Sequence, residues 1–138
     1  MLTKKKINQI IKEFEDSFTC HKIVTGGNEY VFIYDENTNV NIFDDKTKLE
    51  ALTNHVHLIK EDICLCKKYL LIIADNLGLF VLNYLTRKFP GNKFIVYVEI
   101  SNKNAITIRF HQQWNNEEYY YDIYNLNYKD TTIKYYKN

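Results

Sequence analysis

Polar side chains at every second position near the end of the chain could carry acid–base chemistry. The two series are Thr107, Arg109 and His111, followed by Glu118, Tyr120 and Asp122. Side chains two apart share a face of a strand, so two paired antiparallel strands would bring these groups together. A small enzyme could then use His111 as proton carrier, Arg109 as anion stabiliser and Tyr120 as a further polar group. The alternative interpretation, a solvated sheet face with cross-strand ion pairs, is the more common use of such a pattern.

A second group of residues raises the question of a metal site. His55, His57, Cys64 and Cys66 are ligand types that bind Zn²⁺ tetrahedrally. Their spacing is not that of a zinc finger, and residues two apart on a helix point about 200° apart. We therefore predict no metal site and no cofactor. No local motif supports a cysteine nucleophile, and we interpret the paired glycines of residues 25–28 as a hairpin turn and not as a phosphate loop.

A single tryptophan lies in a polar segment that is predicted to be a loop. Trp114 stands between Gln112-Gln113 and Asn115-Asn116, and Glu117 and Glu118 follow at once. An exposed tryptophan beside acids and tyrosines is typical of a protein-binding hot spot. The same residue could fold back as a lid on the sheet, and the sequence leaves both possibilities open.

The helices that must support these groups are indicated by apolar periodicity. Residues 4–18 carry a one-sided stripe from Ile7 to Phe18, with Thr3 as the expected N-cap. Asp44 or Asp45 should cap a short helix, where residues 47–50 also match a capping box. Residues 62–89 keep a helical period up to Pro90, and we favour one long helix. The alternative is a strand over 69–74 followed by a helix over 76–89.

Alternating segments bounded by turn residues predict the strands. The expected strands cover residues 20–24, 29–35, 40–43, 94–101, 105–111, 119–124 and 131–136. Short turns between consecutive strands predict antiparallel pairing. The sequence thus predicts an α+β fold, in which a mainly antiparallel sheet packs against amphipathic helices in a single domain over residues 1–138.

Composition narrows the class of protein. The chain has 138 residues and a formal net charge of +1, without the basic excess that nucleic-acid binding through phosphates usually needs. No continuous apolar segment reaches the length of a membrane span, and no signal peptide is apparent, so we expect a cytoplasmic protein. Three cysteines without such a signal predict reduced thiols and not disulfides.

The C-terminal third resembles a family of binding proteins. The segments 108–114, 117–119 and 122–123 are similar to the C-terminal strands of small immunity proteins from bacterial contact-dependent growth-inhibition and related toxin systems. The resemblance implies a cytosolic protein that binds and blocks a cognate toxin domain, often a nuclease, without chemistry of its own. Such an inhibitor needs aromatic anchors and complementary charge on a rigid scaffold. The candidate partner-binding residues are Arg109, His111, Trp114, Glu117, Glu118, Tyr120 and Asp122.

Overall fold

A computed structural model of the chain describes residues 3–33, 45–60 and 66–138. These ranges contain three helices and six strands, which confirms the α+β class. The helices are α1 (Lys4–Ser17), α2 (Lys46–Thr53) and α3 (Lys67–Lys88). The strands are β1 (Cys20–Thr25), β2 (Asn28–Ile33), β3 (His55–Ile59), β4 (Phe94–Ser101), β5 (Ile106–Gln112) and β6 (Thr131–Lys137).

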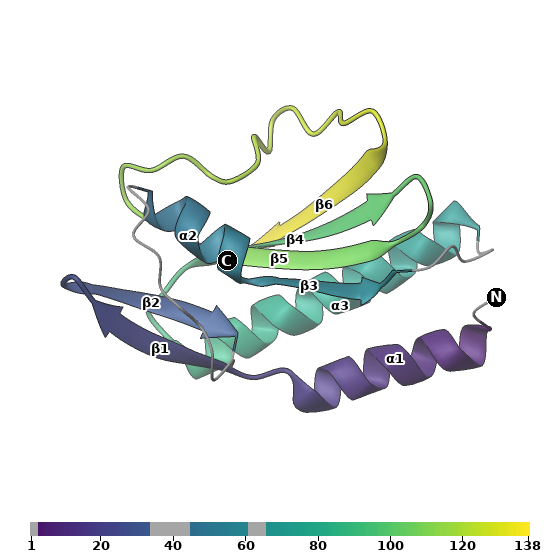
Figure 1. The fold of residues 1–138 in the computed structure, drawn as a ribbon, viewed down its shortest axis with the longest axis horizontal. Coiled ribbons are helices and arrows are strands. Elements are labelled where there is room, and N and C mark those ends of the chain that lie inside the picture. The colour runs from purple at the N-terminus through teal and green to yellow at the C-terminus, as the bar shows by residue number, and fades with distance from the viewer. Residues whose placement is uncertain (1–2, 34–44, 61–65) are drawn as a thin grey trace.

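Four of the strands form one sheet, in the order β3-β5-β4-β6, and β1 pairs with β2 in a separate hairpin (Figure 1). Every pairing is antiparallel, as predicted. In the centre of the sheet Val98 of β4 lies opposite Ile108 of β5 on one side and Lys134 of β6 on the other. The turn between β1 and β2 contains Gly26 and Gly27 at φ 58° and 78°, a conformation that suits glycine.

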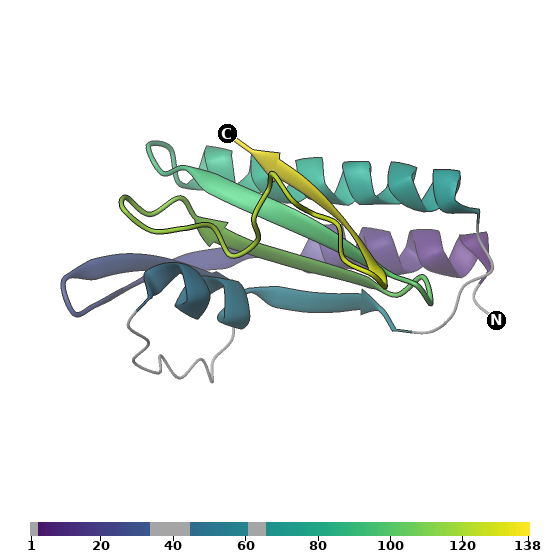
Figure 2. The same ribbon diagram turned by 90° about the horizontal axis from the view of Figure 1, so that it is seen from above.

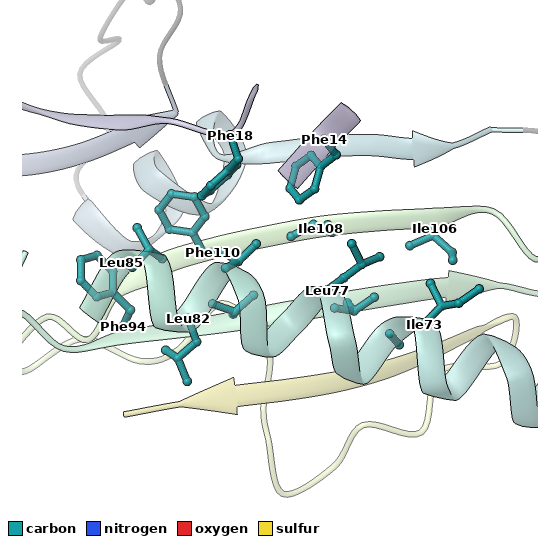
Figure 3. Close-up of a cluster of buried hydrophobic side chains, with 14 of the residues drawn as sticks. Phe14, Phe18, Ile73, Leu77, Leu82, Leu85, Phe94, Ile106, Ile108 and Phe110 are labelled. Carbon is teal, nitrogen blue, oxygen red and sulfur yellow. The ribbon is translucent and has the colours of Figure 1, made fainter. Parts of the chain in front are cut away.

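α1 and α3 lie side by side against one face of the four-stranded sheet (Figure 2). α1 begins after Thr3, whose hydroxyl accepts a hydrogen bond from the Lys6 amide at 3.2 Å. Phe14 of α1 contacts Phe80 of α3, with ring centroids 6.3 Å apart. The apolar side chains of both helices and of the inner sheet face form the main core (Figure 3).

α3 shows one helix over residues 67–88 of the ambiguous stretch, whereas residues 62–65 of the predicted helix lie outside the described residues. Its buried residues, from Leu70 through Leu77 to Leu85, recur at helical spacing, so the strand predicted as an alternative over 69–74 is wrong. The helix ends at Lys88, immediately before Phe89 and Pro90. By length and composition alone α3 is long and apolar enough to cross a membrane. The sequence had predicted no segment of that length and hydropathy. Because α3 buries one stripe against the sheet, we interpret it as the core helix of a small soluble-type domain.

The strands in the described residues differ from the predicted ones at two places. Residues 119–124 form no strand, because their tyrosines pack onto the sheet instead of extending it. β3 was not predicted; its five residues follow α2 after the single residue Asn54. The predicted strand over 40–43 lies outside the described residues.

Candidate functional site

The sheet face opposite α1 and α3 is covered by residues 113–130, which we call the covering loop (Figure 1). This loop joins β5 to β6 across the sheet. Its Tyr119, Tyr120 and Tyr121 pack with Ile123 and Leu126 on Ile95, Tyr97 and Ile133 of the sheet. The face predicted to be solvated is therefore largely buried under a tyrosine-rich layer.

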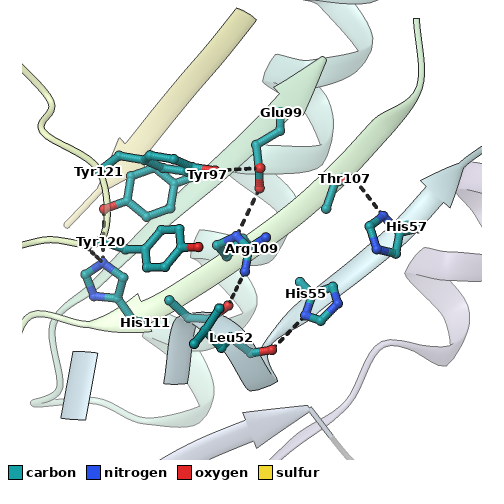
Figure 4. Close-up of polar contacts among 11 residues, drawn as sticks. Leu52, His55, His57, Tyr97, Glu99, Thr107, Arg109, His111, Tyr120 and Tyr121 are labelled. Carbon is teal, nitrogen blue, oxygen red and sulfur yellow. Dashed lines mark hydrogen bonds and ion pairs between the residues drawn. The ribbon is translucent and has the colours of Figure 1, made fainter. Parts of the chain in front are cut away.

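His111 is buried on this face and makes hydrogen bonds from both ring nitrogens (Figure 4). Its Nε2 accepts from the Tyr120 amide at 3.2 Å and lies 3.0 Å from the Tyr97 hydroxyl oxygen. Nδ1 therefore carries the proton and donates to the Gln112 carbonyl at 2.7 Å. Burial lowers the pKa of His111 to about 4, so the ring is neutral at pH 7. The expectation of an exposed His111 was wrong, because period-two spacing does not show whether a loop covers a face.

Arg109 is held between a carboxylate and an aromatic ring (Figure 4). Its Nε donates to Glu99 Oε2 at 3.1 Å, and its Nη1 donates to the Ala51 carbonyl at 2.6 Å. The guanidinium carbon lies 4.8 Å from the centroid of the Tyr120 ring. The Tyr121 hydroxyl donates to the other Glu99 oxygen at 2.6 Å, and burial followed by this carboxylate raises the pKa of Tyr121. Arg109 and Tyr120 do meet, as predicted, although through stacking and not through a pairing of strands.

Glu50 of α2 is a fully buried carboxylate that sequence reasoning assigned only to a capping box. Asp45 is the N-cap of α2, and the Glu50 side chain reaches away from the helix instead. One oxygen accepts from the Val31 amide at 2.9 Å and the Gln112 side chain at 2.7 Å. The other accepts from the Gln112 amide at 2.9 Å and Trp114 Nε1 at 2.6 Å. Burial raises the pKa of Glu50, and the hydrogen bonds from these N–H groups oppose that rise.

Trp114 therefore folds back onto the protein and is not an exposed anchor. Besides the bond to Glu50, its ring packs against Tyr30, with centroids 5.5 Å apart. The ammonium of Lys46 lies 5.1 Å from the ring centroid. Of the two possibilities that the sequence left open, these contacts match the lid.

Glu117 ties the covering loop to the N-terminus of α2. Its Oε1 accepts from the amide and the hydroxyl of Thr47, each at 2.8 Å, and its Oε2 lies 3.5 Å from Lys46 Nζ. Burial alone would raise the pKa of Glu117. The hydrogen bonds with Asp45 and Thr47 and the charge of Lys46 outweigh burial and lower it to about 2. A carboxylate at the start of a helix is also favoured by the helix dipole.

The remaining predicted residues lie at the surface of the covering loop. Glu118 and Asp122 are exposed, and the side chain of Tyr124 is 94% exposed. Residues 117–124 line a hollow of about 570 Å³. The loop is turned locally by Asp122, whose side chain accepts from the Tyr124 amide at 3.0 Å. The structure thus separates the predicted set into residues that hold the loop in place (Arg109, His111, Trp114, Glu117), the half-buried Tyr120 that stacks on Arg109, and the exposed Glu118 and Asp122.

The described residues give little support to a metal site of three or more ligands or to a cysteine nucleophile. No group of three or more His, Cys, Asp or Glu there could hold a metal ion. Cys20 is buried, and burial raises the pKa of its thiol to about 12, which makes it a poor nucleophile. Cys66 is exposed at the start of α3, and Cys64 lies outside the described residues.

Comparisons with protein-family models, curated proteins and solved structures found no match to this chain. The function is therefore argued from the geometry of the covering loop and from the resemblance in the C-terminal third.

Proposed function

We propose that the chain is a cytoplasmic binding protein that neutralises a cognate bacterial toxin domain by direct association. The toxin class, with a nuclease foremost, comes from the resemblance of the segments 108–114, 117–119 and 122–123 to immunity proteins. The contact surface that we propose lies in the segment 117–124 of the covering loop, whose exposed residues are Glu118, Asp122 and Tyr124. The observation that carries this choice is the hollow of about 570 Å³ that these residues line.

The chemistry of this surface suits a basic protein partner. Glu118 and Asp122 present two exposed carboxylates, and Tyr124 presents an almost fully exposed ring. Tyrosine is enriched at interfaces because its ring buries area while its hydroxyl stays hydrogen-bonded. A nuclease binds nucleic acid phosphates with basic residues, and carboxylates placed against them would favour association and block that site.

The loop is also supported in a way that favours tight binding. Trp114 and Glu117 attach its first part to α2, and Tyr121 attaches its middle to Glu99. A segment that is already ordered loses less conformational entropy when a partner binds. The residues beneath the loop therefore contribute to binding by holding it in place and not by contact.

An enzyme that uses His111, Arg109 and Tyr120 receives less support. His111 is buried with its Nε2 facing the Tyr120 amide, and Arg109 is paired with Glu99. A proton carrier must reach its substrate directly or through one water. Nothing in this arrangement favours a substrate position beside His111.

A growth-rescue experiment tests the proposed function. The C-terminal domain encoded by the gene immediately upstream is induced in a test bacterium with and without this protein. We expect the domain to stop growth and the protein to restore it. Toxicity without rescue, or no toxicity, would contradict the proposal.

A binding measurement with purified proteins then tests the surface. The variant Glu118→Lys/Asp122→Lys/Tyr124→Ser should weaken association with the toxin domain by at least about a hundredfold, since charged and aromatic contacts are lost together. The matched control is Glu13→Lys/Asp16→Lys, which makes the same charge change on exposed positions of α1, across the sheet from the loop. Both variants should keep the circular dichroism spectrum of the wild type. Full-strength binding by the loop variant would show that the contact surface lies elsewhere.

A further inference from the structure

Two exposed histidines of β3 stand next to each other on the loop-covered side of the sheet. His55 and His57 are two residues apart on this edge strand, where they lie opposite Arg109 and Thr107 of β5. Their ring centroids are 5.1 Å apart, and the ring planes are inclined at 76° (Figure 4). Neither ring is covered by the described residues of the covering loop, because both side chains are exposed.

The Nδ1 atom of each ring already has a partner within the protein. His55 Nδ1 lies 2.8 Å from the Leu52 carbonyl oxygen, which can only accept, so Nδ1 carries the proton. In the neutral ring the lone pair is then on Nε2. His57 Nδ1 lies 3.0 Å from the Thr107 hydroxyl, which accepts a hydrogen bond when Nδ1 carries the proton. Histidines that bind metals in proteins almost always donate their other ring N–H to such a partner.

The separation of the rings fits a single ion between them. With a Zn–N distance of about 2.1 Å, two imidazole rings that ligate one tetrahedral ion have their centroids about 5.4 Å apart. The observed separation of 5.1 Å is slightly shorter than that value. We propose that His55 and His57 form a two-histidine site for a divalent transition-metal ion, with water in the remaining coordination positions.

The surroundings select the class of ion. Imidazole nitrogens favour Ni²⁺, Cu²⁺ and Zn²⁺, whereas Mg²⁺ and Ca²⁺ prefer oxygen ligands. Arg109 lies opposite His55 in the sheet, and Glu99 compensates its positive charge at 3.1 Å. This site departs from our expectation of no metal, which considered these histidines only together with Cys64 and Cys66.

Calorimetric titration with NiCl₂ tests the site in the full chain without a purification tag. Cys64→Ser/Cys66→Ser serves as the background, so that thiolates do not compete for the ion. We expect one Ni²⁺ per chain and no detectable binding of Mg²⁺. His55→Ala and His57→Ala should each weaken Ni²⁺ binding by more than about tenfold. His21→Ala, which removes a histidine of β1, is the matched control and should leave the affinity unchanged.

A further variant tests whether the Thr107 hydroxyl orients the His57 ring without binding the ion itself. Thr107→Val keeps the shape of the side chain but removes the hydroxyl beside His57 Nδ1, and it should weaken Ni²⁺ binding by about tenfold. The proposal is overturned if the background protein binds no Ni²⁺. It is equally overturned if the His55→Ala/His57→Ala variant binds Ni²⁺ as tightly as the background. Because Glu118, Asp122 and Tyr124 are unchanged in all of these proteins, the result is independent of the proposed toxin binding.

Discussion

The two faces of the four-stranded sheet are buried by different means. The face under α1 and α3 is closed by aliphatic and aromatic side chains at regular spacing. The other face is closed by a loop without regular structure, whose tyrosines donate hydrogen bonds to a carboxylate and to a neutral histidine. Apolar packing depends mainly on volume and shape, whereas a buried polar network depends on each donor meeting an acceptor. The same sheet should therefore respond to different kinds of substitution on its two sides.

The largest difference in stability loss between the two faces should appear for substitutions that keep the volume of the side chain constant. Glu50→Gln preserves shape but places an amide NH₂ against the N–H donors that surround the carboxylate. We expect a loss of about 2–4 kcal/mol in the free energy of unfolding, measured by urea denaturation. Leu77→Met, the matched change under α3, should cost less than about 1.5 kcal/mol. Equal losses in the two variants would remove the distinction between the faces.

Acid should weaken the loop-covered face through His111. Its pKa is about 4 in the folded protein against an ordinary value of 6.5, so the unfolded chain takes up a proton in this window and the folded chain does not. Stability that is present above pH 6.5 is therefore lost as the pH falls towards 4. Between pH 6.5 and 5 the loss should be about 1.5 kcal/mol.

The matched variant for this pH prediction is His111→Gln, which cannot titrate. It should be less stable than the wild type at pH 7, and its stability should vary less between pH 6.5 and 5. Denaturation curves at several pH values would show this difference in slope. Parallel pH profiles for the two proteins would mean that His111 is not the group responsible.

The sequence also predicted the packing of the helix-covered face better than that of the loop-covered face. The alternation from Phe94 to Ile100 and from Ile106 to Phe110 placed the helix-covered core face of β4 and β5 correctly, because period-two spacing is a local pattern. The bond between Trp114 and Glu50 joins residues 64 positions apart, and no local pattern records it. The tyrosines of 119–124 resembled a strand because β-propensity describes any half-buried surface, including a loop packed on a sheet.

The sequence predicted which residues of the candidate site are neighbours better than it predicted how they are held. Arg109, His111 and Tyr120 are neighbours, as the spacing suggested, yet the partners that fix them, Glu99 and Tyr121, were not identified. Glu99 is the only charged residue of β4, and that exception was the available signal. A buried carboxylate needs donors from elsewhere in the fold, which a single sequence does not specify.

The smallest predicted effect concerns close packing on the helix-covered face. Gly78 of α3 faces the ring of Tyr136 on β6, and a methyl group at this position would overlap that ring. Gly78→Ala should cost about 1–2 kcal/mol, because overpacking outweighs the better helix propensity of alanine. In a Tyr136→Ala background the ring is gone, and the same substitution should instead stabilise the protein by about 0.5–1 kcal/mol. A double-mutant cycle measured by thermal or urea unfolding gives this change of sign, which a purely local effect on the helix would not produce. Tyr136→Phe keeps the ring and removes only the hydroxyl, which donates to Asp75 at 2.5 Å in the wild type. Gly78→Ala should cost the same in this background as in the wild type.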